Sequence, residues 1–114
     1  MIIILSGQRI PIQPTTVQTV NITSASATVQ WLIPYISYTP EHYTIDFGTA
    51  REMLHLRSPT LSSSTDISAL NITYALTLQA LVPNTVYFFQ LQSVNTYGET
   101  TTPVMMFATL EAGI

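Results

Sequence analysis

Cysteine and lysine are both absent from this chain of 114 residues, and charged side chains make up only 8% of it. Without cysteine there is no disulfide framework and no thiolate site for zinc. The three basic residues are all arginines, too few to form the basic stripe that nucleic acid or an anionic membrane surface requires. Nucleic acid is therefore not expected as a partner.

Long apolar runs are missing as well. No stretch approaches the roughly 20 residues that span a bilayer. The apolar start Met1–Leu5 is too short for a signal sequence and has no basic flank. We expect contact with a membrane only through other parts of a longer protein, and any secretion signal to lie outside this sequence.

What the chain does contain is apolar and uncharged polar residues. Hydrophobic residues account for 46% of the sequence and aromatic residues for 10%, which is too apolar for a disordered segment. Threonine and the β-branched residues favour strands, and no long run of helix formers interrupts them. The composition predicts one all-β domain, large enough to bury about two-thirds of its unfolded surface.

Proline, glycine and serine punctuate the sequence at short intervals, which is typical of a sandwich or barrel of short strands. Between these turns, apolar and polar residues alternate, so that each strand gains one apolar face. Two sheets with one apolar face each form a sandwich. The predicted strands are Thr16–Ile22, Ala27–Leu32, Tyr43–Phe47, one or two short strands within Arg51–Ser68, Tyr74–Leu81, Thr85–Asn95 and Val104–Leu110.

The segment from Leu81 to Tyr87 contains a Pro-Asn turn between two predicted strands. Tyr87 comes just inside the second strand, where its ring can join the core while its hydroxyl reaches back to the backbone near the turn. This arrangement is the tyrosine corner of β-sandwiches. Tyr87 and the single tryptophan, Trp31, are therefore interpreted as scaffold residues.

The order and spacing of these residues resemble a fibronectin type III domain. The resemblance rests on Trp31, Tyr43-Thr44-Ile45-Asp46-Phe47, the Leu81-x-Pro83-x-Thr85-x-Tyr87 corner, Ser93-Val94-Asn95, Gly98 and Phe107-x-Thr109. It implies an immunoglobulin-like antiparallel sandwich of seven strands in two sheets with Greek-key connections, used in modular extracellular proteins.

The resemblance covers residues 14–110, which we take as the domain. Residues 1–13 are interpreted as an extension or linker, in which Ile2–Leu5 is a candidate edge strand that pairs either within the fold or between chains. Residues 111–114 are interpreted as a linker. The expected core comprises Trp31, Tyr43, Ile45, Leu81, Pro83, Tyr87, Phe89, Leu91 and Phe107.

Titratable groups that could do chemistry are few. His42 and Asp46 lie on one face of a predicted strand but about 13 Å apart at ~3.3 Å per residue, whereas zinc ligands sit ~2 Å from the metal. There is no glycine-rich phosphate loop and no Gly-x-Ser-x-Gly elbow. We expect no enzyme, no cofactor and no metal, and solvated side chains at Arg51 and Arg57.

Two sequons for N-glycosylation occur, at Asn21 and Asn71. Asn71 is the favoured acceptor, because it is expected in a loop before a strand, whereas Asn21 is expected at the end of one. Three tyrosines, Tyr35, Tyr38 and Tyr97, lie in loops that meet at one pole of this fold. Tyrosine-rich loops suit protein recognition, although each ring has an alternative role as a cap over the core.

The resemblance implies a non-catalytic module that acts as a spacer and as a weak protein-contact surface. We expect it in a cell-adhesion or receptor-type protein, extracellular or at the cell surface. Its partners would be neighbouring domains of the same chain and, through the tyrosine loops, a protein ligand. Two alternatives stay open: an accessory domain of a secreted carbohydrate-active enzyme, and a cytoplasmic scaffold repeat.

Overall fold

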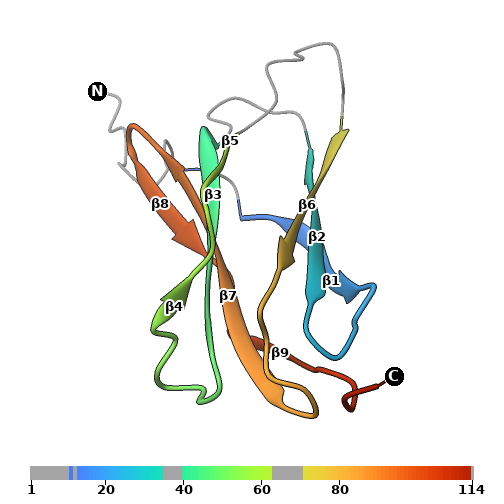
Figure 1. The fold of residues 1–114 in the computed structure, drawn as a ribbon. Helices are drawn as coiled ribbons and strands as arrows, with labels where there is room; N and C mark the ends of the chain where they lie inside the picture. The colour runs from blue at the N-terminus through green and yellow to red at the C-terminus, as the bar shows by residue number, and fades with distance from the viewer. Residues whose placement is uncertain (1–10, 12, 35–39, 63–70, 114) are drawn as a thin grey trace, which may run out of the picture.

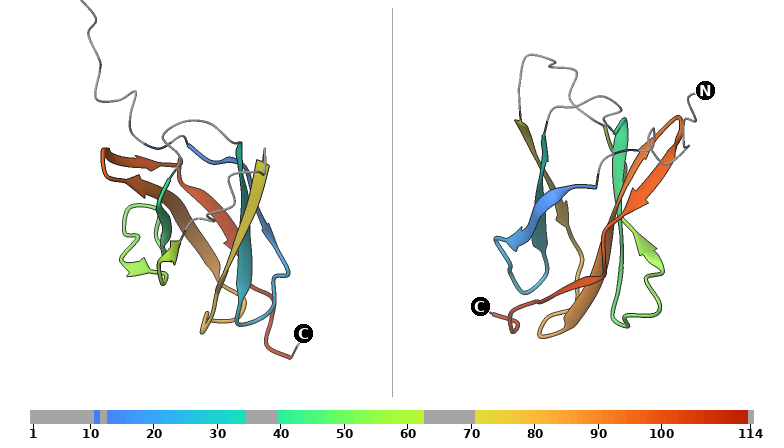
Figure 2. Two further views of the ribbon diagram at one scale, coloured as in Figure 1. Left: turned by 90° about the horizontal axis from the view of Figure 1, so that it is seen from above. Right: turned by 180° about the vertical axis from the view of Figure 1, so that it is seen from behind.

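The computed structural model describes residues 11, 13–34, 40–62 and 71–113, which form two antiparallel sheets and no helix (Figure 1). The sheets pack face to face, and the view from above in Figure 2 shows them as two separate layers. The predicted all-β sandwich is confirmed. No helix among these residues is long and apolar enough to cross a membrane.

The first sheet has three strands in the order β1-β2-β6, and the second is built around β3 and β7. Within the second sheet the order is β4-β3-β7-β8, with β5 also paired to β3 and β9 to β7. The bounds are β1 Thr15–Val20, β2 Ala27–Pro34, β3 His42–Gly48, β4 Leu56–Arg57, β5 Leu61–Ser62, β6 Asn71–Leu78, β7 Val86–Asn95, β8 Gly98–Thr101 and β9 Met105–Ala108.

The predicted strands are confirmed within a few residues, and one observed strand, β8, was not predicted. What was expected as a loop after Asn95 is a tight hairpin that leads directly into β8, with Asn95 paired to Gly98. Gly98 has a φ of 147°, a backbone conformation that favours glycine. Because β8 reads Gly-Glu-Thr-Thr, it has no apolar alternation from which a strand could be predicted.

Strand β6 begins earlier than the pattern indicated. It starts at Asn71, which pairs with Pro34 of β2, so Asn71 opens a strand. The expectation that Asn71 lies in a loop was therefore wrong. The strand ends at Leu78, shortly before Ala80 takes a positive φ of 58°.

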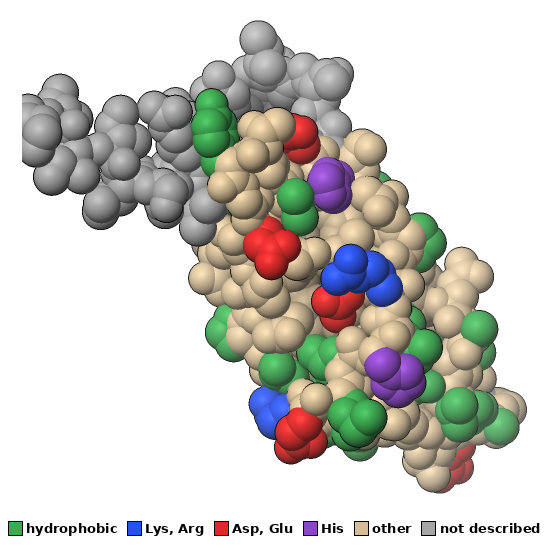
Figure 3. Space-filling view, turned by 90° about the vertical axis from the view of Figure 1, so that its left-hand side faces the viewer, with side chains coloured by type: hydrophobic (Ala, Val, Ile, Leu, Met, Phe, Trp, Pro, Cys, Tyr) green, Lys and Arg blue, Asp and Glu red, His purple; other side chains and the backbone are tan. Residues whose placement is uncertain are grey.

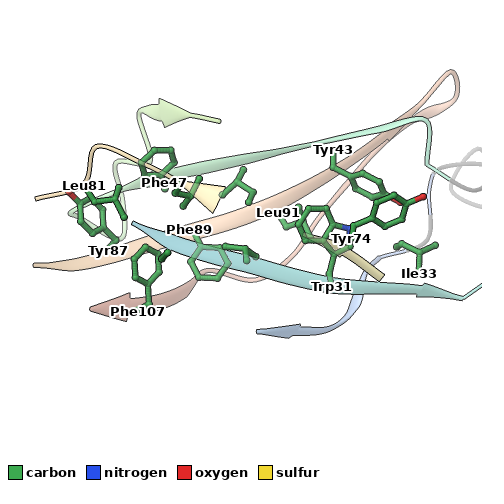
Figure 4. Close-up of a cluster of buried hydrophobic side chains, with 14 residues drawn as sticks. Trp31, Ile33, Tyr43, Phe47, Tyr74, Leu81, Tyr87, Phe89, Leu91 and Phe107 are labelled. Carbon is green, nitrogen blue, oxygen red and sulfur yellow. The ribbon is translucent and has the colours of Figure 1, made fainter. Parts of the chain in front are cut away.

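The core consists of side chains that alternate along both sheets. Trp31 of the first sheet is 1% exposed, and its ring lies 5.2 Å from Tyr43 and 6.0 Å from Tyr74, centre to centre. Towards the other end, Tyr87, Phe89 and Phe107 form a second group of rings (Figure 4). Eight of the nine expected core residues belong to this buried cluster; Pro83 is only partly buried.

The tyrosine corner is present. The backbone N–H of Val82 donates a hydrogen bond of 2.8 Å to the Tyr87 hydroxyl oxygen. Thr109, which is buried, accepts a hydrogen bond from the N–H of Thr85 at 3.0 Å and donates to the Val82 carbonyl at 2.6 Å. The turn is thus tied to the last strand as well as to β7.

Two further buried hydroxyls continue the backbone pairing where strands are interrupted. Between β8 and β9, Thr102 accepts the N–H of Leu91 on its side-chain oxygen at 3.0 Å, while its own N–H donates to the Leu91 carbonyl at 3.0 Å. Beyond β4, the Ser58 hydroxyl accepts the N–H of Ile45 at 2.8 Å. Unpaired buried backbone groups are costly, so these side chains permit the strand breaks.

The described domain begins and ends at opposite poles (Figure 1). At the upper pole, the carbonyl of Pro11 accepts a hydrogen bond from Thr100 of β8. At the lower pole, the N–H of Leu110 donates to the Thr23 carbonyl at 3.0 Å, and the N–H of Asn84 donates to the Leu110 carbonyl at 2.8 Å. The long axis of the sandwich therefore separates the two ends.

Candidate interaction surfaces

Titratable side chains are sparse in the part of the chain that the structure describes. In the part of the chain that the structure describes, no three His, Cys, Asp or Glu residues are grouped to hold a metal ion. The ring of His55 lies beside a backbone carbonyl, with Nδ1 3.2 Å from the Met53 oxygen. The features that remain are surfaces, and the two sheets present very different ones.

The outer face of the second sheet carries an ion pair. Arg57 of β4 is directly opposite Asp46 of β3, and it donates two hydrogen bonds to that carboxylate, at 2.7 and 3.1 Å. The hydrogen bond and the charge of Asp46 raise the pKa of Arg57 above its ordinary value. Because the Arg57 side chain is 59% exposed, the pair fixes the orientation of the guanidinium more than it stabilises the fold.

Further polar side chains on the same face are hydrogen-bonded across strands. Thr44 of β3 donates to the Gln92 amide oxygen at 3.1 Å, and the Gln92 amide nitrogen donates to Glu99 of β8 at 2.8 Å. At the lower end, the guanidinium of Arg51 lies 5.1 Å from the centre of the Phe88 ring. Both arginines are exposed, as expected, but each also has a partner on this face.

Figure 3 shows this side of the molecule, where charged groups and imidazoles are scattered and the hydrophobic side chains form only small separate patches. Side chains that are already held by their neighbours lose little conformational entropy when a partner binds. The face is thus suited to polar, water-exposed contacts with another protein, of the kind found at the rim of an interface.

The outer face of the first sheet is neutral. Strands β1, β2 and β6 contain no Asp, Glu, Lys, Arg or His. Thr28 and Thr77 share a hydrogen bond of 2.8 Å, and the Gln18 amide donates to Gln30 at 3.3 Å. Sequence reasoning missed this surface, although the absence of charge from all three predicted ranges was a readable signal.

Of the three expected contact tyrosines, the structure describes one. Tyr97 is at the tip of the β7–β8 hairpin and is 52% exposed, and its backbone N–H donates to the Asn95 side chain at 2.8 Å. Tyr35 and Tyr38 lie outside the described residues. A role of these tyrosines in protein contact stays a prediction.

The two sequons differ in setting. Asn21 is exposed, has a φ of 51° and follows β1. The hydroxyl of Thr23, the third residue of that sequon, accepts the N–H groups of Ala25 and Ser26 at 3.1 and 2.9 Å. Asn71 is the first residue of β6. Occupancy of either site stays a prediction.

Two antiparallel sheets in this strand order, joined by a tyrosine corner, define an immunoglobulin-like β-sandwich. The chain belongs to the fibronectin type III domain family, whose sequence profile matches residues 12–106. The resemblance inferred from the sequence is confirmed. Domains of this family are generally non-catalytic modules of multidomain proteins. A search of curated proteins gave no match.

Solved structures with the same fold belong to different kinds of protein. The FN1–FN3 domains of chicken CNTN1 are 21% identical with a TM-score of 0.68, over 90% of this chain and 33% of that one. Titin domains A168–A170 are 17% identical with a TM-score of 0.67, again over 90% and 33%. This chain thus spans about one third of either structure.

The sensor domain of the anti-sigma factor RsgI4 of Pseudobacteroides cellulosolvens, in its short form, is 19% identical with a TM-score of 0.60, over 90% of this chain and 96% of that one. At these identities the likeness concerns the fold alone. Neither a compartment nor a ligand follows from it.

Proposed function

We propose that this domain is a non-catalytic spacer module of an extracellular or cell-surface multidomain protein, with a weak protein-contact surface. The observation that carries the proposal is the separation of its ends. The chain enters beside β8 at Pro11 and leaves past Leu110 at the lower pole. Neighbouring domains attached there would be held apart by the full length of the sandwich.

The first-sheet side of the lower pole is suited to close packing against a neighbour. Its turns, residues 21–26 and 79–85, carry no charged side chain, whereas the β3–β4 turn of the second sheet carries Arg51 and Glu52. Bringing such a surface against another domain requires no desolvation of ions, which is the costly part of polar association. The polar face of the second sheet, away from these turns, would meet a separate protein partner.

The proposed extracellular location rests on the two sequons and on the exposed position of Asn21. Expression as a secreted protein in mammalian cells, with mass measured before and after glycosidase treatment, tests it. At a site that carries a glycan, replacing the asparagine, by Asn21→Gln or by Asn71→Gln, should lower the measured mass by that of one glycan. A secreted protein without any glycan would contradict the proposal as far as it rests on these sequons.

The spacer role is tested by a distance measurement, which the absence of cysteine makes simple. Spin labels on Gln13→Cys and Glu111→Cys, both at exposed positions, should give one narrow distribution at long distance. A matched pair on Gln13→Cys and Thr101→Cys, at the same pole, should give a short one. Equal distances for the two pairs, or a broad distribution for the first, would contradict the spacer role.

A further inference from the structure

The first sheet ends in two strands, and their outer edges differ. β1 is irregular: its pairing with β2 shifts register between Thr15 and Gln18, and Thr16 has a φ of 52°. β6 pairs with β2 over eight consecutive residues without a shift. No described strand pairs with the other edge of β6.

Exposed sheet edges are usually protected by lysine, proline, a bulge or a very short strand. β6 reads Asn-Ile-Thr-Tyr-Ala-Leu-Thr-Leu and has none of these features. Its outward side chains at Thr73, Ala75 and Thr77 are small and exposed. None of the described strands covers this edge, and the backbone of a regular strand edge is a template for pairing with another extended chain.

We propose that this edge pairs with β6 of a second copy of the chain, joining two first sheets into one continuous antiparallel sheet. A two-fold axis at Ala75 sets Ala75 opposite Ala75, Thr73 opposite Thr77, and Tyr74 opposite Leu76. Like therefore meets like, with threonine facing threonine and apolar residues facing apolar ones. Along β6, alternate residues point their backbone N–H and C=O groups toward β2 and away from it. In this register, a residue whose groups point away from β2 faces an equivalent residue of the second copy, so the two sets of groups can pair.

Local electrostatics do not oppose a second copy at this edge. The chain has a net charge of −3, which opposes self-association in general. However, β1, β2 and β6 contain no charged residue, so the approaching edges bring no like charges together.

The two-fold arrangement also limits the assembly. Each molecule uses its β6 edge once, so the contact is isologous and closes at a dimer. The irregular edge of β1 at the far side of the sheet does not offer a second regular template. Self-pairing would hold in any compartment, so its failure would leave the proposed spacer role unaffected.

Sedimentation velocity tests the proposal, with concentrations from roughly 1 to 200 μM, where a weak dimer dissociates. We expect a monomer–dimer equilibrium for the wild type. Ala75→Lys should raise the dissociation constant roughly tenfold or more, because two lysines would stand directly opposite each other. Gln30→Lys is the matched control, since Gln30 is the neighbour of Ala75 on β2; it adds the same charge to the same face away from the edge.

The register is tested by two further variants. An equimolar mixture of Ala75→Lys and Ala75→Glu should restore the dimer, because opposite charges would then face each other. Ala75→Cys should cross-link under mild oxidation as the only cysteine in the chain, while Gln30→Cys should not. A monomeric wild type at every concentration would overturn the proposal, even if a foreign extended peptide binds. A dimer that Ala75→Lys leaves unchanged, with its melting curve also unchanged, would overturn it too.

Discussion

The two sheets of this domain share one core but present opposite surfaces. Between residues 13 and 110, every charged residue that the structure describes belongs to the second sheet or its connections, whereas the first sheet and its turns contain none. The strands that flank β3 and β7 in the second sheet, namely β4, β5, β8 and β9, are short. The first sheet ends on one side in the regular strand β6. The second sheet thus presents polar side chains that are hydrogen-bonded to one another. The first sheet presents a neutral face and a regular edge strand, β6, with no described strand on its outer side.

The largest effect is expected where the sheets meet. Trp31→Ala removes a ring of the first sheet that packs against Tyr43 of the second. Truncating a buried aromatic costs about 3–5 kcal/mol, against a total stability of about 5–15 kcal/mol for such domains. We expect no stable fold at 37 °C, measured by thermal unfolding followed by circular dichroism.

The control for this variant is Leu32→Ala, on the same strand but only partly buried. It should unfold cooperatively with a much smaller loss of stability. A cooperative transition of Trp31→Ala within a few degrees of wild type would show that the indole does not hold the two sheets together.

An intermediate effect is expected at the strand break of the second sheet. Thr102→Val keeps the side-chain shape but removes the acceptor of the Leu91 N–H. An unpaired buried donor costs about 1–3 kcal/mol, which urea denaturation would measure.

Thr101→Val, at an exposed neighbouring position, is the matched control and should be nearly neutral. Equal stabilities of the two variants would mean that the Thr102 hydroxyl does not stand in for the missing strand partner.

A smaller effect is expected at the corner. Tyr87→Phe removes the acceptor of the Val82 N–H without changing the packing of the ring. A typical net loss is about 0.5–1.5 kcal/mol, again measured in urea. Tyr97→Phe, at the exposed hairpin, should unfold at the same urea concentration as wild type; if it loses as much as Tyr87→Phe, the corner has no special role.

The smallest effect is expected on the charged face. Asp46→Asn breaks the pairing with Arg57, but the guanidinium is largely exposed, so the free energy of unfolding should hardly change. Because the pKa of Arg57 is raised in the fold, its contribution is complete at neutral pH and is lost only in strongly alkaline solution. Unfolding of Asp46→Asn between pH 5 and 8, compared with wild type, measures this. A marked pH-dependent loss in that window would contradict the interpretation.

Much of the fold could be predicted because it depends on local patterns. Alternation identified the strands, and the spacing from Leu81 to Tyr87 identified the corner. Tyr74 shares the parity of Leu76 and Leu78 and was within reach of the same reasoning, but its strand was predicted to begin there. Pro83 was expected in the core because it belongs to the corner, yet a turn proline keeps one side in water.

The features that escaped prediction depend on distant partners. Thr102 and Ser58 look like loop residues in the sequence, and only the register of the sheet brings them to Leu91 and Ile45. The pairing of Arg57 with Asp46 likewise requires β4 to fold back on β3. The free edge of β6 could not be predicted, because strand order is not encoded in the alternation of any single strand.

Residue-resolved hydrogen exchange of the β6 amides tests the central contrast between the sheets most directly. Alternate amides bonded to β2 should exchange slowly at every protein concentration. The other set should exchange fast in dilute solution and slow markedly as the concentration rises. Fast exchange of that second set at all concentrations would contradict the account, and so would protection that does not depend on concentration, since another part of the same chain would then cover the edge.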